Sequence, residues 1–125
     1  MKNVEKQQNN DCIFCKIIKG EIPCKKLYED EQVLAFLDIS GDYKDHTLVI
    51  PKRHCTNVLD ASNCRLTACA KAISKISNEF IKKGYNGVNV FNNSGECAGQ
   101  SVMHLHFHII PRKNGDGYNI NTNKN

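Results

Sequence analysis

The sequence predicts an α+β domain, in which a five-stranded antiparallel sheet carries one long helix and a short helix lies near the N-terminus. Only one stretch, about residues 60–83, repeats apolar residues at the three- and four-residue spacing of a long amphipathic helix. β-branched or alternating apolar runs occur in five other stretches, mostly joined by connections short enough for hairpins, which favours antiparallel pairing. The 125 residues fit one compact domain.

The first predicted element is a short helix that begins at Ile13 in the segment IFCKIIKG. Its spacing directs Ile13, Ile17 and Phe14 inward. The helix ends at Gly20, and Pro23 follows, because glycine readily closes a helix and proline cannot continue one.

Five strands are expected from the β-branched, aromatic and alternating apolar runs. The first two, about residues 25–29 and 33–37, form a hairpin around the polar turn EDEQ. The segment HTLVIPKR, residues 46–53, supplies a third strand that its proline ends. The last two strands are GVNVFNN, residues 87–93, and VMHLHFHII, residues 102–110, with SGECAGQS between them.

The long helix is expected over about residues 60–83. Asp60 or Ser62 can cap its N-terminus, and Gly84 can close its C-terminus. The predicted inward stripe consists of Leu66, Ala70, Ile73, Ile76, Phe80 and Ile81.

The composition is that of an ordinary globular protein, with 40% hydrophobic and 24% charged residues and a formal net charge of +4. Lysine and arginine are scattered, which favours a small anionic ligand over nucleic acid. We expect no membrane association and a cytoplasmic location, with nuclear presence left open, because neither an export signal nor a membrane-spanning run is visible. Seven cysteines in such a chain favour thiols or a metal site over disulfides.

The segment SVMHLHFHIIPR, residues 101–112, places three of the five histidines, His104, His106 and His108, at every second position. Alternate residues of a strand share one face, so the pattern predicts a row of imidazoles opposite an apolar face. Neighbouring positions about 6.8 Å apart can share one small group or metal ion, whereas the outer pair, about 13 Å apart, cannot easily do so. Neutral imidazole is a ligand, a base or a nucleophile, so the pattern alone leaves open a metal site and a nucleophile with its helpers.

Taken together, these segments resemble the histidine triad (HIT) superfamily and, within it, the HINT branch of nucleotide-binding proteins. The run HLHFHII preceded by GQSV resembles the triad signature, and DCIFCKIIKGEIP, AFLDIS, HTLVIPKRH and NNSGECAGQSVMHLHFHIIPR match in order and at similar spacing. The resemblance covers about residues 11–112 and implies a HIT-like fold, a HIT domain at residues 11–113, and a homodimer. The Asn/Lys-rich ends, residues 1–10 and 114–125, are expected to be flexible tails.

Members of the HINT branch hydrolyse purine nucleoside phosphoramidates to an amine and the nucleoside monophosphate, and the resemblance implies this activity here. It implies that His106 is the nucleophile on the α-phosphorus and forms a covalent nucleotidyl-histidine that water resolves. His108 would stabilise charge on the phosphate or leaving group, and Ser101 completes the catalytic set. The resemblance also places contacts to the phosphate at Asn93, Gly99, Gln100, Ser101 and His108.

For the nucleoside, the resemblance implies that Asp38 accepts hydrogen bonds from both ribose hydroxyls. The purine base is expected in an apolar slot, and a preference for adenine or guanine is not predicted. The slot residues are Ile13, Phe14, Ile17, Ile22 and Phe36. His46, at the start of the third strand, is expected to order the strand end rather than to bind substrate.

Cys12 and Cys15 form a C-x-x-C motif, which by itself suggests zinc or redox chemistry. A closed zinc site needs four ligands, and His54 and His104 are available to complete a set of two cysteines and two histidines. Bacterial-type members of the branch carry zinc in this set, so the resemblance implies a structural zinc ion that orders the site. No partner is readable from the sequence for Cys24, Cys55, Cys64, Cys69 and Cys97.

Other functions stay open at this point. Dinucleoside polyphosphate hydrolases of the superfamily keep three histidines but generally differ in the IFCKII and DIS segments, and the nucleotidyl transferases usually carry glutamine in place of His108. A catalytically quiet nucleotide-binding or scaffolding protein, or a zinc-stabilised domain that uses the imidazoles as ligands, fits the same residues. The Asn-rich C-terminal segment lacks the aromatic tail of animal members, so the leaving group is not predicted.

Overall fold

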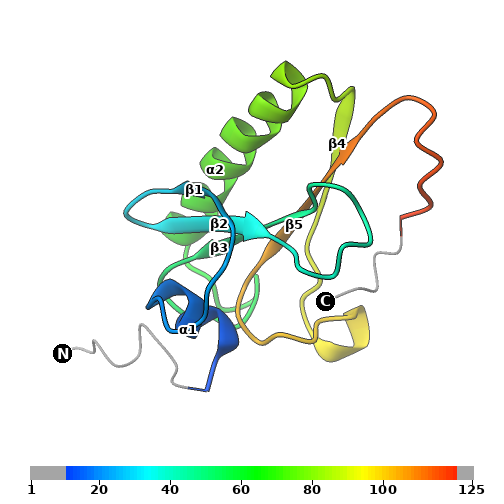
Figure 1. Ribbon diagram of the computed structural model, residues 1–125. Coiled ribbons are helices and arrows are strands. Elements are labelled where there is room, and N and C mark those ends of the chain that lie inside the picture. Colours follow the sequence, from blue (N-terminus) through cyan, green and yellow to red (C-terminus); the bar gives the residue numbers. More distant parts are fainter. Residues whose placement is uncertain (1–10, 121–125) are drawn as a thin grey trace.

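The computed structural model describes residues 11–120 of the chain. Within this range the protein is an α+β domain with a five-stranded sheet and one long helix, as the sequence predicts (Figure 1). In chain order the elements are α1 (Ile13–Ile18), β1 (Lys26–Glu29), β2 (Val33–Leu37), β3 (Thr47–Pro51), α2 (Asn63–Lys82), β4 (Gly87–Phe91), the 3₁₀ turn η2 (Glu96–Ala98) and β5 (Phe107–Arg112).

The strands form one sheet in the order β1-β2-β3-β5-β4, and every neighbouring pair is antiparallel. β1, β2 and β3 follow one another along the chain, whereas α2 and β4 intervene before β5 enters between β3 and β4. His108 of β5 therefore lies opposite Leu48 on one side and Phe91 on the other. This topology places the last triad histidine in the interior of the sheet.

The centre of the sheet is buried on both faces. Val33 and Ala35 of β2 belong to the cluster under α2, whereas Leu34 and Phe36 pack with Phe14 of α1. Successive strand residues point to opposite faces, so one uninterrupted apolar run in β2 supplies two separate cores. The two helices thus cover opposite faces of the same strands (Figure 1).

The ends of α2 follow the predicted caps, but its buried side differs from the predicted stripe. The Ser62 hydroxyl accepts a hydrogen bond from the Arg65 N–H at 3.2 Å, and Gly84 follows the helix with φ +108°. Ala70 and Ile81, predicted to face inward, are exposed. The buried residues are Ala68, Cys69, Ala72, Ile76 and Phe80. The small side chains among these residues let the helix lie close to the sheet. The predicted stripe consists mostly of large apolar residues and therefore omits the small ones.

β5 begins later than predicted. Its first residue is Phe107, so His104 and His106 precede the strand and only His108 lies on it. The preceding backbone is bonded elsewhere, because the Leu105 N–H donates to the Cys55 carbonyl at 2.8 Å. The prediction that one strand carries all three histidines is therefore wrong, because the backbone of the first two lies outside the sheet. All three histidine side chains are nevertheless buried.

Contacts hold the chain beyond β5 up to the end of the described range. The Asn114 N–H donates to the Asn86 side chain at 2.7 Å, and the Arg112 guanidinium contacts both carboxylate oxygens of Asp116 at 2.8 Å. The flexibility expected for residues 114–120 stays a prediction, and the expected N-terminal tail and the last five residues lie outside the described residues. No helix between residues 11 and 120 is long and apolar enough to cross a membrane.

Candidate active site and metal centre

The three triad histidines are buried next to α1. Phe14 meets the rings of His104 and His106 edge-on, with ring centroids 5.8 and 5.2 Å away. The rings of His106 and His108 are 5.2 Å apart, so the histidines form one continuous group although their backbones differ. The helix that carries the C-x-x-C motif therefore also packs on the triad.

The orientation of His106 is fixed by its Nδ1 atom, which lies 2.7 Å from the carbonyl oxygen of His104. A carbonyl only accepts, so Nδ1 carries the proton and Nε2 carries the lone pair. The Asn92 side chain donates to the carbonyl of His106 at 2.9 Å and holds the backbone of the same residue. An imidazole with a defined tautomer and a fixed backbone is prepared to act as a nucleophile or base through Nε2.

His108 is positioned by two side chains from distant parts of the chain. Its ring stacks on Phe91, with centroids 4.4 Å apart and planes within 8°. Its Nδ1 atom lies 2.9 Å from Nε2 of His46, a residue for which sequence reasoning gave only a role at the strand end. No spacing signal links His46 to the triad, because the pairing of β3 with β5 brings them together.

His46 also reaches Asp38, which follows β2. Its Nδ1 atom lies 3.1 Å from Oδ2 of Asp38, but the carboxylate stands off the N–H direction, so the contact is electrostatic rather than a well-aligned hydrogen bond. Burial lowers the pKa of His46, and the nearby Asp38 charge opposes that shift. The result is a buried, readily neutral imidazole between a carboxylate and His108.

Two glycines shape the loop between β4 and β5, where the sequence predicts contacts to the phosphate. Gly95 and Gly99 adopt φ values of +99° and +98°, which other residues rarely tolerate. Ser101 is exposed just after this turn, whereas Asn93 is buried at its start. Four of the predicted phosphate contacts, Asn93, Gly99, Gln100 and Ser101, therefore lie on this loop, whereas His108 lies on β5.

The side chain of Gln100, expected to contact the phosphate, is hydrogen-bonded within the protein. Its side-chain nitrogen donates to the carbonyls of Thr56 at 2.7 Å and Val102 at 3.0 Å. Its side-chain oxygen accepts from the Gly95 N–H at 2.8 Å and from the Asn57 amide at 3.1 Å. These four bonds engage the amide inside the protein, so Gln100 braces the loop instead of extending toward a ligand.

The residues predicted for the base slot are largely brought together. Phe14, Ile17 and Phe36 share one buried cluster, and Ile22 packs against it. Ile13 was predicted to point inward, but its side chain is 48% exposed. The buried side of this short helix is formed by Phe14, Cys15 and Ile17. Four of the five residues thus form one apolar group beneath α1.

Cys12, Cys15, His54 and His104 converge on one point, and their ligand atoms all lie within 4.8 Å of one another. Nδ1 of His54 is 3.1 Å from Nδ1 of His104 and 3.4 Å from Sγ of Cys15. Cys12 Sγ is 3.3 Å from the same His104 atom. A tetrahedral zinc ion with Zn–S bonds of about 2.3 Å and Zn–N bonds of about 2.0–2.1 Å places its ligands about 3.3–3.8 Å apart. The donor set and its spacing fit zinc.

His104 has the tautomer that a ligand needs. Its Nε2 atom lies 2.9 Å from the Pro51 carbonyl and donates to it, so the lone pair is on Nδ1, which faces the cluster. Burial lowers the pKa of His104 to about 4, which keeps the ring neutral. Both properties favour metal binding by this residue.

The site thus combines three buried histidines, one of them with a defined tautomer, with an adjoining cluster of metal-ligand type. Comparison with known proteins agrees. The HIT domain family model matches residues 19–115, and the chain belongs to the HIT family.

The relatives include proteins of the HINT branch. An uncharacterized HIT-like protein of Methanocaldococcus jannaschii is 53% identical over 106 residues, which span 85% of this chain and 82% of that protein. The adenosine 5'-monophosphoramidase hnt1 of Schizosaccharomyces pombe is 46% identical over 103 residues, spanning 82% of this chain and 75% of the relative. Similarity at this level, across most of both chains, places nucleotide hydrolases among the relatives of this protein.

A solved structure of similar fold contains zinc. The zinc-bound histidine triad family protein of Mycobacterium smegmatis is 36% identical, with a TM-score of 0.84, over 87% of this chain and 80% of that one. A metal ion therefore occurs in a protein of this fold. Among residues 11–120, the Cys/His cluster described above is a group of residues that could hold one.

Proposed function

We propose that this protein hydrolyses purine nucleoside phosphoramidates, releasing an amine and a nucleoside monophosphate, as an adenosine 5'-monophosphoramidase does. The observation that carries the proposal is the tautomer of His106, whose Nδ1 is tied to the His104 carbonyl at 2.7 Å so that Nε2 holds the lone pair. The phosphoramidase named among the relatives supports the substrate class.

The reaction proceeds in two steps on His106. Nε2 attacks the α-phosphorus, the bond from phosphorus to the leaving nitrogen breaks, and the amine departs with a proton supplied by His108. Water then attacks the nucleotidyl-histidine, its proton returns to His108, and the nucleoside monophosphate leaves with His106 neutral again. His46, at 2.9 Å from His108, holds that ring in place through both steps.

The remaining site residues bind the nucleotide. Asp38 accepts the ribose hydroxyls, and the apolar cluster beneath α1 receives the purine. The glycine-shaped loop holds the phosphoryl oxygens through Ser101, Gly99 and Asn93, while Gln100 keeps the loop in shape. Apolar walls bind a purine without reading its edge strongly, so the proposal covers purine nucleosides and assigns no preference between adenine and guanine.

Zinc is the proposed cofactor, held by Cys12, Cys15, His54 and His104. With four protein ligands it has no open coordination position, so its contribution is to fix the geometry of the N-terminal helix against the triad. His104 joins the two, since it supplies a ligand atom on Nδ1 and the carbonyl that orients His106.

A homodimer in the cytoplasm is the proposed working form. β4 is an edge strand of the described sheet, and Val90 on it and Ile81 on α2 leave large apolar side chains exposed. Pairing this strand edge and the adjoining helix with those of a second copy would cover both. The sedimentation coefficient of the purified protein tests this part of the proposal.

The activity is tested with an adenosine phosphoramidate that has a fluorescent amine leaving group, using the wild type, His106→Ala, and Cys97→Ala as an exposed control. We expect turnover and an intact-mass adduct of one nucleotidyl group in the wild type and control, and neither in a folded His106→Ala variant. Wild-type protein that binds AMP without turnover would assign a binding role instead. Faster cleavage of a diadenosine polyphosphate would assign a polyphosphate hydrolase.

A further inference from the structure

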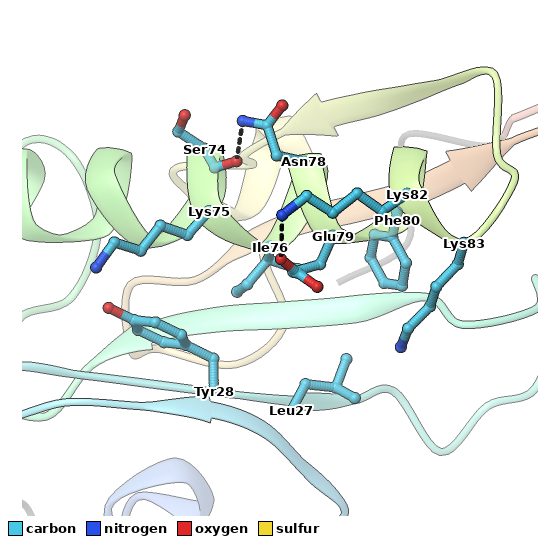
Figure 2. Close-up of a pocket in the computed structure, with 10 residues that line it drawn as sticks. All are labelled: Leu27, Tyr28, Ser74, Lys75, Ile76, Asn78, Glu79, Phe80, Lys82 and Lys83. Atoms are coloured by element: carbon cyan, nitrogen blue, oxygen red, sulfur yellow. Dashed lines mark hydrogen bonds and ion pairs between the residues drawn. The ribbon is translucent and has the colours of Figure 1, made fainter.

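A cavity of about 520 Å³ opens between α2 and β1, on the face of the sheet away from the triad (Figure 2). Ile76 and Phe80 of α2 belong to the core that α2 forms with the sheet, whereas His108 lies opposite Leu48, a member of the core beneath α1. The sheet therefore separates this cavity from the proposed nucleotide site. Its volume is in the range of small-molecule sites, about 300–1,000 Å³.

Four of the ten residues that line the cavity are apolar or aromatic, and the other six are polar or charged side chains of α2 and of the residue that follows it. Ile76 and Phe80 line it from the helix, and Tyr28 and Leu27 line it from β1 (Figure 2). The Tyr28 hydroxyl donates to Asp30 at 2.6 Å, which fixes the ring as a wall and engages its polar end. Leu27 is 42% exposed at this rim, a large apolar side chain with no evident task in the core. An elongated apolar body suits these walls.

The charges around the cavity are arranged by position. Lys75 stands at one end, with its ammonium group 6.0 Å from the centroid of the Tyr28 ring, and Lys83 stands at the other end (Figure 2). Eight residues of helix separate these lysines by about 12 Å at 1.5 Å per residue. Between them Glu79 pairs with Lys82 at 3.2 Å, so the charges in the middle of the rim neutralise each other. The net positive charge around the cavity therefore lies at its two ends, on Lys75 and Lys83.

The edge of β1 argues against a peptide strand as the occupant. β1 has four residues, its pairing with β2 is interrupted by an irregularity between Lys26 and Tyr28, and Lys26 is itself paired with Glu29 at 3.0 Å. Short, irregular and charged edges resist the addition of a further strand. The occupant is better matched by a small molecule seated in the cavity.

We propose that this cavity binds an elongated small molecule with an apolar, flat body and an anionic group at each end. Lys75 and Lys83 bind the two anionic groups, and the body lies over Phe80 and Tyr28. The site is independent of the triad and of the proposed phosphoramidate hydrolysis, because it lies on the opposite face of the sheet.

Biphenyl-4,4'-dicarboxylate, titrated into the ¹⁵N-labelled full-length protein, is a suitable probe, with biphenyl-4-carboxylate as its matched single anion. We expect saturable amide shifts confined to residues 27–28 and 74–83, unchanged by saturating AMP, and weaker binding of the single anion. Lys75→Gln and Lys83→Gln should each lower affinity for the diacid by about two- to fivefold, the range of an exposed ion pair. Lys71→Gln, which removes an exposed lysine of the same helix outside the cavity, should leave the affinity unchanged.

Several outcomes overturn the proposal. These are the absence of saturable shifts at the cavity, equal affinity for the two acids, displacement of the diacid by AMP, or equal weakening by Lys71→Gln. Circular dichroism of each variant establishes that the fold is retained, so that a loss of binding reports on the lysine itself.

Discussion

The Nε2 atom of His46 lies 2.9 Å from Nδ1 of His108, and the other nitrogen of the His46 ring lies 3.1 Å from the Asp38 carboxylate. The residue proposed to bind ribose is thus connected through one buried imidazole to the residue proposed to supply a proton at phosphorus. The three side chains come from the end of β2, the start of β3 and the interior of β5, and sheet pairing alone brings them together.

Replacing His46 with glutamine should lower kcat for phosphoramidate hydrolysis by about 100-fold, the lower end of the ~10²–10⁴ that acid–base groups contribute. His108 would lose the ring that orients it, while the nucleotide contacts remain, so KM should change little. Steady-state kinetics on His46→Gln beside Asp38→Asn check this, since the latter should raise KM as well. An unaltered kcat in His46→Gln would contradict a positioning role.

His46 should also make the free energy of unfolding depend on pH. Burial lowers the pKa of His46 in the folded protein, while Asp38 opposes the shift and His106 adds to it. As pH falls below the ordinary value of about 6.5, the unfolded chain binds a proton that the folded protein does not, so stability present at higher pH is lost. The slope due to this one group is at most about 1.4 kcal/mol per pH unit.

Urea unfolding at several pH values, for the wild type and His46→Gln, measures that contribution. The groups that face His46 are Asp38, His108 and the ring of Tyr43, which lies 5.9 Å away, and all are retained in the variant. The free energy of unfolding of the wild type should therefore fall more steeply between about pH 6.5 and pH 5 than that of the variant. Parallel curves for the two proteins would show that His46 titrates normally in the fold.

Cys15→Ala should abolish zinc binding and destabilise the protein. Cys15 is fully buried, and its sulfur lies 3.4 Å from His54 and 3.6 Å from His104, so no other group can replace it. We expect about one zinc per chain in the wild type and none in the variant, with a loss of at least about 2 kcal/mol, or about 8 °C in Tm. Cys97→Ala, at an exposed position, is the control for metal content and Tm.

Gln100→Ala should destabilise the loop before the triad. The substitution removes the partner of two carbonyls, one backbone N–H and one side-chain amide, and each buried group left unpaired costs about 1–3 kcal/mol. We expect a loss of at least about 3 kcal/mol in chemical denaturation. Gln32→Ala, at an exposed glutamine, should stay within about 0.5 kcal/mol of the wild type. Similar effects of the two substitutions would mean that Gln100 does not brace the loop.

Much of the fold could be predicted because local pattern and tertiary structure agree. β2 was predicted at its observed bounds, since a short apolar run between turn residues has few alternatives, and Ser62 and Gly84 mark the ends of α2. The start of β5 could not be predicted. Its alternation continues through His104 and His106, but hydrogen bonds to Cys55 and Asn92 take that backbone out of the sheet.

The candidate site was predictable where its residues are consecutive or form a motif. The metal-ligand cluster follows from C-x-x-C and two histidines together with the family resemblance, and the structure brings the four together. The roles of His46 and Gln100 depend on partners more than 40 residues away, and no local pattern encodes such contacts. The contact of Asn92 with the His106 carbonyl was likewise not predicted, because it depends on how the loop between β4 and β5 folds back.

Because β5 begins later than predicted, the positions of the three evenly spaced histidines are determined by two different sets of contacts. His108 is set by its sheet register between Leu48 and Phe91, while His106 is set by the carbonyl of His104 two residues before it. An extra residue inserted between His106 and Phe107 would leave His108 in register and move His106, the proposed nucleophile, away from it. The motif thus connects the metal-ligand cluster to the sheet through a fixed number of residues.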